Sequence, residues 1–225
     1  MLVIKNNEWA RTGDEKYSKE IKIAALDMGA CFNNFAVGID FMGKIYRVGG
    51  LGLKELCKKA IESSKDASIL EARIAMMANK LVSGWKEKGV TDVVIGCCQE
   101  DYLQLCHNNS ENWLYKTHTP EIFVESLREI CTHEHISFDS KFNEAYTSSA
   151  CSLTSDVMPL ANKKDDKTIF NGIRSETDYN IYFIYPNLMI DANVNAAANI
   201  ARKYGATLKF EAWSEYVRSI KKKTI

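Results

Sequence analysis

The chain has 225 residues, is 46% hydrophobic and carries 29 basic and 29 acidic residues, so its formal net charge is zero. This composition supports a packed core and excludes a disordered chain. Because the charges balance, any affinity for nucleic-acid phosphates has to come from local clusters of Lys and Arg, such as Lys221 to Lys223.

No apolar run approaches the ~20 residues needed to cross a bilayer, and the run from Leu2 to Ile4 is too short for a signal-peptide core. We therefore expect a cytoplasmic protein with no membrane partner. The seven cysteines show no repeated Cys-x-x-Cys spacing and are expected to be reduced, mostly buried thiols.

The first half of the chain predicts strands and then helices. Residues 1–20 are polar and mixed, which indicates an N-terminal extension. Short apolar runs predict strands over 21–26, 35–41 and 44–48, with a hairpin turn at Met42-Gly43. Apolar residues at helical spacing predict helices over 53–61 and 70–85, and the apolar run 90–97 predicts a buried strand.

The second half predicts a helix, further strands and a last helix. Thr119-Pro120-Glu121 has the cap, the proline and the acid of a helix start. Residues 136–142 alternate as in a strand, and 181–184 is another short apolar run. Residues 155–180 lack a clear period and indicate a loop or small insertion. The Ala-rich segment 194–204 predicts a helix that ends at Gly205, with a basic tail over 205–225.

This order of elements is that of the RNase H fold. We therefore predict one α/β domain over residues 21–204, an RNase H-like (RuvC) fold with a mixed sheet and helices on both faces.

Three acids stand where this fold would place a metal site. Asp27 follows the first strand, Glu144 follows the strand over 136–142, and Asp191 opens the last helix. Phosphodiester hydrolysis requires charge neutralisation at the phosphate and an activated water, which two Mg²⁺ or Mn²⁺ ions roughly 3.5–4 Å apart can provide through carboxylate ligands. Taken singly, each acid is explained as well by a turn or cap role, and Asp191 by an N-cap.

The motifs around these acids resemble the RuvC nuclease domain of the TnpB (OrfB) transposon-associated nucleases and the related type V CRISPR effectors. The matching strings are Leu26-Asp27-Met28-Gly29, Glu144-Ala145-Tyr146-Thr147-Ser148 and Asn195-Ala196-Ala197 with Asn199-Ile200. The resemblance implies an RNA-guided, metal-dependent DNA endonuclease with Asp27, Glu144 and Asp191 as catalytic metal ligands.

The chain departs from the family pattern at three places. Cys151 stands where a zinc ribbon would begin, but Thr154 replaces its second cysteine, so we expect no zinc. Many relatives have an acid two residues after the position of Asp191, where this chain has Asn193. Only about twenty residues precede the motifs, so the chain is a fragment, a split subunit with a protein partner, or a stand-alone derivative.

Several polar side chains near these motifs are candidate nucleic-acid ligands. Tyr146, Thr147 and Ser148 can reach a phosphate backbone through their hydroxyls, and can equally cap the next segment. Arg174 and Asn195 are further candidates, although a solvated arginine is the simpler interpretation of the first. A group of cysteines and histidines matches no regular zinc spacing: Cys106, His107, His118, Cys131, His133 and His135.

Three alternatives to an RNA-guided nuclease stay open at this point. A relative that binds RNA, DNA or a protein partner without cutting is favoured by Asn193 and by the missing N-terminal half. A homodimeric, structure-selective nuclease such as a junction resolvase is a second alternative. A sugar or acetate kinase relative is a third, but no Gly-rich phosphate loop follows Gly96.

Overall fold

The computed structural model describes residues 21–28, 34–96, 119–154, 156–159, 168–184 and 188–208. The expected N-terminal extension, most of the basic tail and the cysteines and histidines between 97 and 118 lie outside these residues. Of the helices in the described ranges, none combines the length and apolar character that crossing a membrane requires.

The domain begins with the predicted meander. Strands β1 (Ile23–Asp27), β2 (Asn34–Asp40) and β3 (Ile45–Gly49) pair antiparallel in this order. Gly43 closes the β2–β3 turn with a φ of 82°, which residues with a Cβ rarely adopt. The predicted hairpin turn is therefore confirmed.

The rest of the main sheet is parallel to β1. Helices α1 (Leu51–Glu62) and α2 (Ser64–Glu87) lead into β4 (Asp92–Gly96), and α4 (Thr119–His133) leads into β5 (Ser137–Phe142). β4 pairs with β1 and β5 with β4, both in parallel, so the strand order is β3-β2-β1-β4-β5. This is the order of the RNase H-like fold, and the predicted fold class is confirmed.

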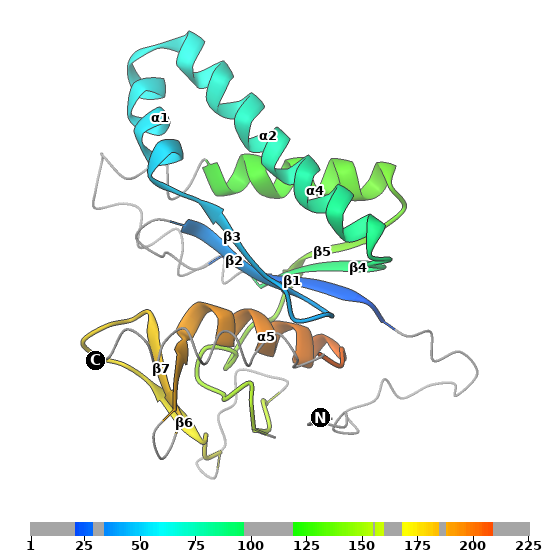
Figure 1. Cartoon of the computed structure of the whole chain (residues 1–225), viewed down its shortest axis with the longest axis vertical. Helices are drawn as coiled ribbons and strands as arrows, with labels where there is room; N and C mark the ends of the chain where they lie inside the picture. The colour runs from blue at the N-terminus through cyan, green and yellow to red at the C-terminus, as the bar shows by residue number, and fades with distance from the viewer. Residues whose placement is uncertain are drawn as a thin grey trace.

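Helices cover both faces of this sheet, as predicted (Figure 1). α1, α2 and α4 lie on one face, where the ring of Tyr46 meets Trp85 of α2 edge to face at 5.6 Å. The last helix, α5 (Ala192–Tyr204), lies on the other face. It ends at Gly205, whose φ of 103° suits the left-handed position after a helix.

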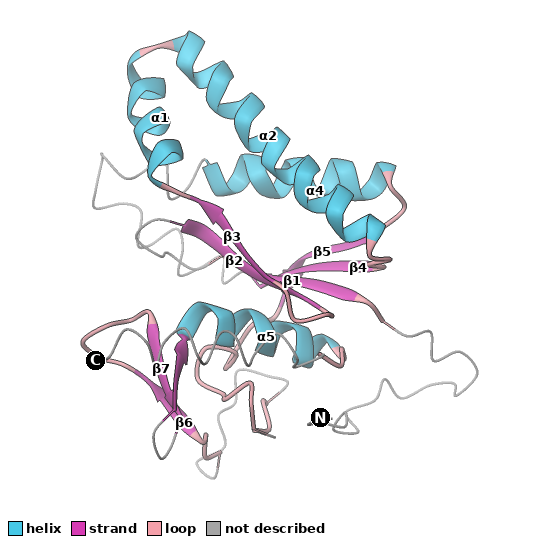
Figure 2. Ribbon diagram, in the orientation of Figure 1, coloured by secondary structure: helices cyan, strands magenta, loops and turns pink. Residues whose placement is uncertain are grey.

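A second, smaller sheet lies beside α5 (Figure 2). Its strands β6 (Gly172–Arg174), β7 (Ile181–Ile184) and β8 (Leu188–Asp191) pair antiparallel in this order. β6 falls within the segment 155–180, for which we expected a loop or small insertion. The correction has a simple reason, because a strand of three residues that begins with glycine leaves no period in the sequence.

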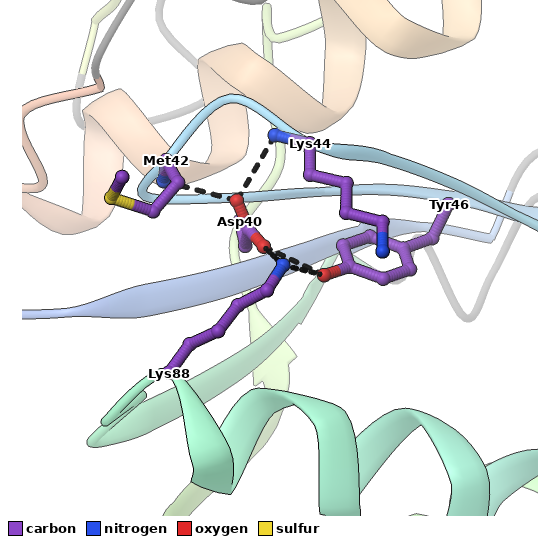
Figure 3. Close-up of polar contacts among 5 residues, drawn as sticks. All are labelled: Asp40, Met42, Lys44, Tyr46 and Lys88. Atoms are coloured by element: carbon purple, nitrogen blue, oxygen red, sulfur yellow. Dashed lines mark hydrogen bonds and ion pairs between the residues drawn. The ribbon is translucent and has the colours of Figure 1, made fainter.

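A buried carboxylate joins the β2–β3 hairpin to the end of α2 (Figure 3). Asp40 is fully buried, and its Oδ1 accepts hydrogen bonds of 3.0 Å from the amides of Met42 and Lys44. Its Oδ2 accepts bonds of 2.6 Å from the Tyr46 hydroxyl and the Lys88 Nζ. Because Lys88 caps α2, this network fixes the helix against the hairpin.

Candidate metal and nucleic-acid site

One row of paired residues crosses the main sheet on the face that α5 covers. It consists of Arg47 on β3, Val37 on β2, Asp27 on β1, Gly96 on β4 and Phe142 on β5. Residues paired directly across neighbouring strands point to the same face of a sheet. The side chain of Asp27 therefore points toward α5.

Three contacts show that α5 runs along this row. The carboxylate of Asp191 pairs with the guanidinium of Arg47 at 3.0 Å. The side chain of Ile200 lies against Gly96, where a built Cβ would meet it. The ring centroids of Tyr204 and Phe142 are 5.5 Å apart. These pairs lie over β3, β4 and β5 in turn, so the middle of α5 lies over β1 and β2. Asp27 at the end of β1 is thus covered by the alanine-rich part of the helix, where small side chains let it lie close to the sheet.

Glu144 lies beside Asp27, as its close approach to Gly96 shows. A Cβ built on Gly96 would come within 2.4 Å of Glu144 Oε2. Gly96 is the direct partner of Asp27 in the parallel ladder, where neighbouring strands are about 4.8 Å apart. The predicted carboxylates of Asp27 and Glu144 are therefore brought together on one face, about one strand apart.

Asp191 has a structural task at the start of α5. Its Oδ1 accepts hydrogen bonds from the amides of Asn193 (2.9 Å) and Val194 (3.2 Å), which makes it the N-cap. Its Oδ2 accepts a hydrogen bond from Arg47 at 3.0 Å. Both carboxylate oxygens are engaged, so the structure shows the alternative cap role. The metal-ligand role of Asp191 stays a prediction.

Asn193 lies within α5, two residues after the N-cap Asp191, and on the side of the helix that faces the sheet. It precedes Ile200 by seven residues, which is about two helical turns or ~10.5 Å, so the two side chains lie on the same side of the helix. Asn193 is 2% exposed, and its Oδ1 accepts a hydrogen bond of 3.1 Å from Arg174 of β6. Arg174 also donates from Nε to the carbonyl of Tyr179 at 2.7 Å, which fixes its direction.

Lys203 adds a second positive group, one that we did not predict. Its Nζ donates to the carbonyl of Ala145 at 2.9 Å, directly after Glu144. Burial lowers the pKa of Lys203, and the nearby charge of Glu144 offsets this only in part. Lys203 follows Ile200 by three residues on a predicted helix, and residues at this spacing lie on the same side of a helix. This spacing could have indicated that Lys203 faces the sheet.

The polar residues after Glu144 form a tight turn. Tyr146 has a φ of 69°, and Ser148 is exposed to solvent. Thr147 is 2% exposed, and its hydroxyl donates to the carbonyl of Glu144 at 2.8 Å. Ser148 is exposed and Tyr146 is half-buried, and both stay candidates for nucleic-acid contact. Thr147 has an internal role, because its hydroxyl is used inside the turn.

Asn195 and Asn199 hold that turn against α5. Asn195 is fully buried, accepts from the amide of Ser152 and donates to the carbonyl of Ala150, both at 2.8 Å. Asn199 donates to the carbonyls of Thr147 and Ala150. The structure thus corrects the prediction that Asn195 contacts nucleic acid, because both ends of its amide bind backbone inside the protein.

A buried carboxylate ties the turn to the small sheet. Asp156 is 4% exposed and accepts from the amides of Cys151 at 2.8 Å and Asn171 at 2.9 Å. It also accepts from the hydroxyl of Thr154 at 2.6 Å and from the Asn171 side chain. Burial raises the pKa of Asp156, but these hydrogen bonds outweigh it and hold the pKa below its usual value. Arg174 follows Asn171 by three residues, so this contact also places β6.

In the described ranges, no three His, Cys, Asp or Glu side chains are grouped as a metal site. Lys203 lies near the carboxylate of Glu144, whereas Arg174 binds Asn193 and Arg47 binds Asp191. Asp27 and Glu144 supply oxygen donors of the kind that Mg²⁺ and Mn²⁺ take, and the donor chemistry therefore fits these ions.

No family model and no curated protein matches the chain. Among solved structures it is similar to a chain of the cryo-EM structure of a Cas12f1–sgRNA–target DNA complex, with 15% sequence identity and a TM-score of 0.43. The match covers 80% of this chain and 49% of that one, so the chain spans about half the length of its match.

Proposed function

We propose that the chain is a RuvC-type nuclease domain that binds a divalent cation, Mg²⁺ or Mn²⁺, through Asp27 and Glu144 and hydrolyses DNA phosphodiester bonds. The observation that carries the proposal is the position of Glu144 against Gly96, the strand partner of Asp27. Two acids from distant parts of the chain meet on the covered face of an RNase H-like sheet, within the motifs that resemble the TnpB family.

Each residue has a task in this proposal. The carboxylates of Asp27 and Glu144 hold the ion, which when bound neutralises phosphate charge and lowers the pKa of a coordinated water. Arg174 and Lys203 provide positive charge beside the pair and attract the nucleic-acid backbone. The buried turn after Glu144, held by Asn195 and Asn199, keeps its carboxylate in place.

The proposed substrate and partners rest on the sequence motifs. The E-A-Y-T-S string and the N-A-A-x-N-I helix favour DNA as the substrate and a guide RNA as the source of sequence recognition. A separate protein chain that supplies RNA- and DNA-binding surfaces is a further proposed partner.

The test is a cleavage assay with labelled single-stranded DNA and the purified full chain in Mn²⁺, with and without co-purified RNA. We expect Asp27→Ala and Glu144→Gln to abolish cleavage. The matched control is Glu71→Gln, which removes an exposed acid of α2 on the other face of the sheet. Cleavage that persists in Asp27→Ala would refute the proposed site.

A second candidate function is nucleic-acid binding without cleavage, and the pairing of Asn193 with Arg174 favours it. Asn193 has an amide where many relatives have an acid, and this amide is hydrogen-bonded to the guanidinium of Arg174. Both features weaken metal binding in that part of the site. In this case the wild-type chain retains DNA or RNA in a gel-shift assay, with a strong dependence on salt, but cuts neither. Arg174→Gln then lowers the affinity for nucleic acid.

A further inference from the structure

On the α5 side of the site, the polar side chains at residues 191 and 193 are bound by arginines. We infer that the site binds a single divalent cation, that this cation is held by Asp27 and Glu144, and that the Asn193–Arg174 pair takes the place where a second cation would bind. The inference rests on the proposed function and narrows it to one ion.

The first argument is the position of Asn193. Its side chain is on the side of α5 that faces the row containing Asp27, and it is almost completely buried. A second cation between α5 and Asp27 would need an anionic ligand on this side of the helix. The sequence provides a neutral amide, and the oxygen of that amide accepts its hydrogen bond from Arg174 at 3.1 Å.

The second argument is the position of Asp191, the acid nearest to Asn193. Its two oxygens bind the first turn of α5 and the guanidinium of Arg47. An ion at Asp191 would have to share these oxygens with the amides of the first turn or lie beside the Arg47 guanidinium, whose charge repels it. Asp191 is therefore a weak competitor for metal.

The third argument is charge. A fixed guanidinium in contact with Asn193 repels a divalent ion in the same space, and arginine does not lose its proton at any working pH. Asp27 and Glu144, two carboxylates one strand apart, offset the charge of one divalent ion. Among the described residues of the site, the next acid, Asp191, is paired with Arg47, so a second divalent ion beside Arg174 would bring positive charge that is not offset.

The measurement is Mn²⁺ binding to the full chain, by electron paramagnetic resonance of free Mn²⁺ and by calorimetry, which do not depend on cleavage. We expect a single Mn²⁺ per wild-type chain, lost in Asp27→Asn and kept in Asp191→Asn. We expect Asn193→Asp combined with Arg174→Gln to gain a second Mn²⁺, because the two changes place a carboxylate on the sheet-facing side of α5 and remove the guanidinium beside it. Circular dichroism confirms that each variant is folded.

Three results overturn the inference. One is a second Mn²⁺ bound by the wild type and lost in Asp191→Asn, which would make Asp191 a ligand and leave the proposed function intact. Another is an Asn193→Asp, Arg174→Gln double variant that folds but binds no additional ion. The third is a wild type that binds no Mn²⁺, or binding that survives Asp27→Asn, which would remove the proposed function as well.

Discussion

Gly96 and Glu144 fit together so closely that residue 96 can carry no side chain. A Cβ at this position would lie 2.4 Å from Glu144 Oε2 and 2.4 Å from Ile200 Cδ1. The glycine is required here by close approach and not by its backbone conformation. The absence of a side chain on β4 lets the Glu144 carboxylate reach the neighbourhood of Asp27.

Gly96→Ala should therefore damage the site. The added methyl displaces the Glu144 carboxylate or Ile200, so we expect weaker Mn²⁺ binding and a loss of about 1–3 kcal/mol in the free energy of unfolding. Calorimetry and urea denaturation measure the two effects. Gly84→Ala is the control, since a Cβ at Gly84 in α2 meets nothing within 4 Å. It should keep the Mn²⁺ affinity and raise the free energy of unfolding by up to about 1 kcal/mol, as expected for alanine in place of glycine inside a helix. Unchanged Mn²⁺ affinity in Gly96→Ala would argue against this placement of Glu144.

Asp191→Ala and Asp191→Asn should separate the cap from the charge. Alanine removes the hydrogen bonds to the first turn of α5 and should cost about 1 kcal/mol of stability. Asparagine caps nearly as well and loses only the ion pair with Arg47, whose side chain is 46% exposed, so the change should be small. Thermal denaturation of both variants checks this order. Equal losses would mean that the ion pair, not the cap, carries the contribution of Asp191.

Asp156→Asn should destabilise the turn and alter the acid sensitivity of the protein. Because the folded state holds the pKa of Asp156 below its usual value, the carboxylate stabilises the fold above the ordinary carboxyl pKa of about 4. This contribution is lost as the pH falls through the lowered value. We expect the variant to lose about 1.5–3 kcal/mol at pH 7 and less at pH 2, measured by urea denaturation. A loss that is equal at both pH values contradicts this account.

Asp40→Ala should loosen the end of α2. It leaves the Tyr46 hydroxyl and the Lys88 ammonium without their shared carboxylate, and removal of one member of a buried ion pair costs about 3–5 kcal/mol. The lower end applies because Lys88 is 32% exposed and can turn toward water. Guanidinium denaturation measures the loss, and hydrogen exchange should locate it in the hairpin and the α2 C-terminus. Lys88→Met should cost less, since Asp40 keeps its bonds to two amides and to Tyr46.

The strands and helices with strong local signals were predictable. The Met42-Gly43 turn, the helix start at Thr119 and the end of α5 at Gly205 lie where the sequence indicates. β6 and β8 were not predicted, because strands of three and four residues are too short to show alternation. Their existence depends on pairing with β7, which is decided by the tertiary structure.

The site was predictable only in part, because its geometry depends on register. Asp27 and Glu144 were recognised from motifs, and the structure brings them together through Gly96. Nothing in the sequence pairs Arg47 with Asp191, which are 144 residues apart. The hydrogen bond of Arg174 to Asn193 likewise follows from the packing of the small sheet beside α5.

The course of α5 along the row has a consequence for how the site forms during folding. β1 carries Asp27 near the start of the described chain, whereas α5 is the last described helix, so their contact closes a long loop of chain. Contacts between such distant segments form slowly, because the entropy of loop closure is lost before the contact gives any stabilisation. During synthesis, β1 and β2 leave the ribosome well before the helix that covers them. The face of the sheet that bears Asp27 then stays open to water, or to chaperones, until the end of α5 has been made.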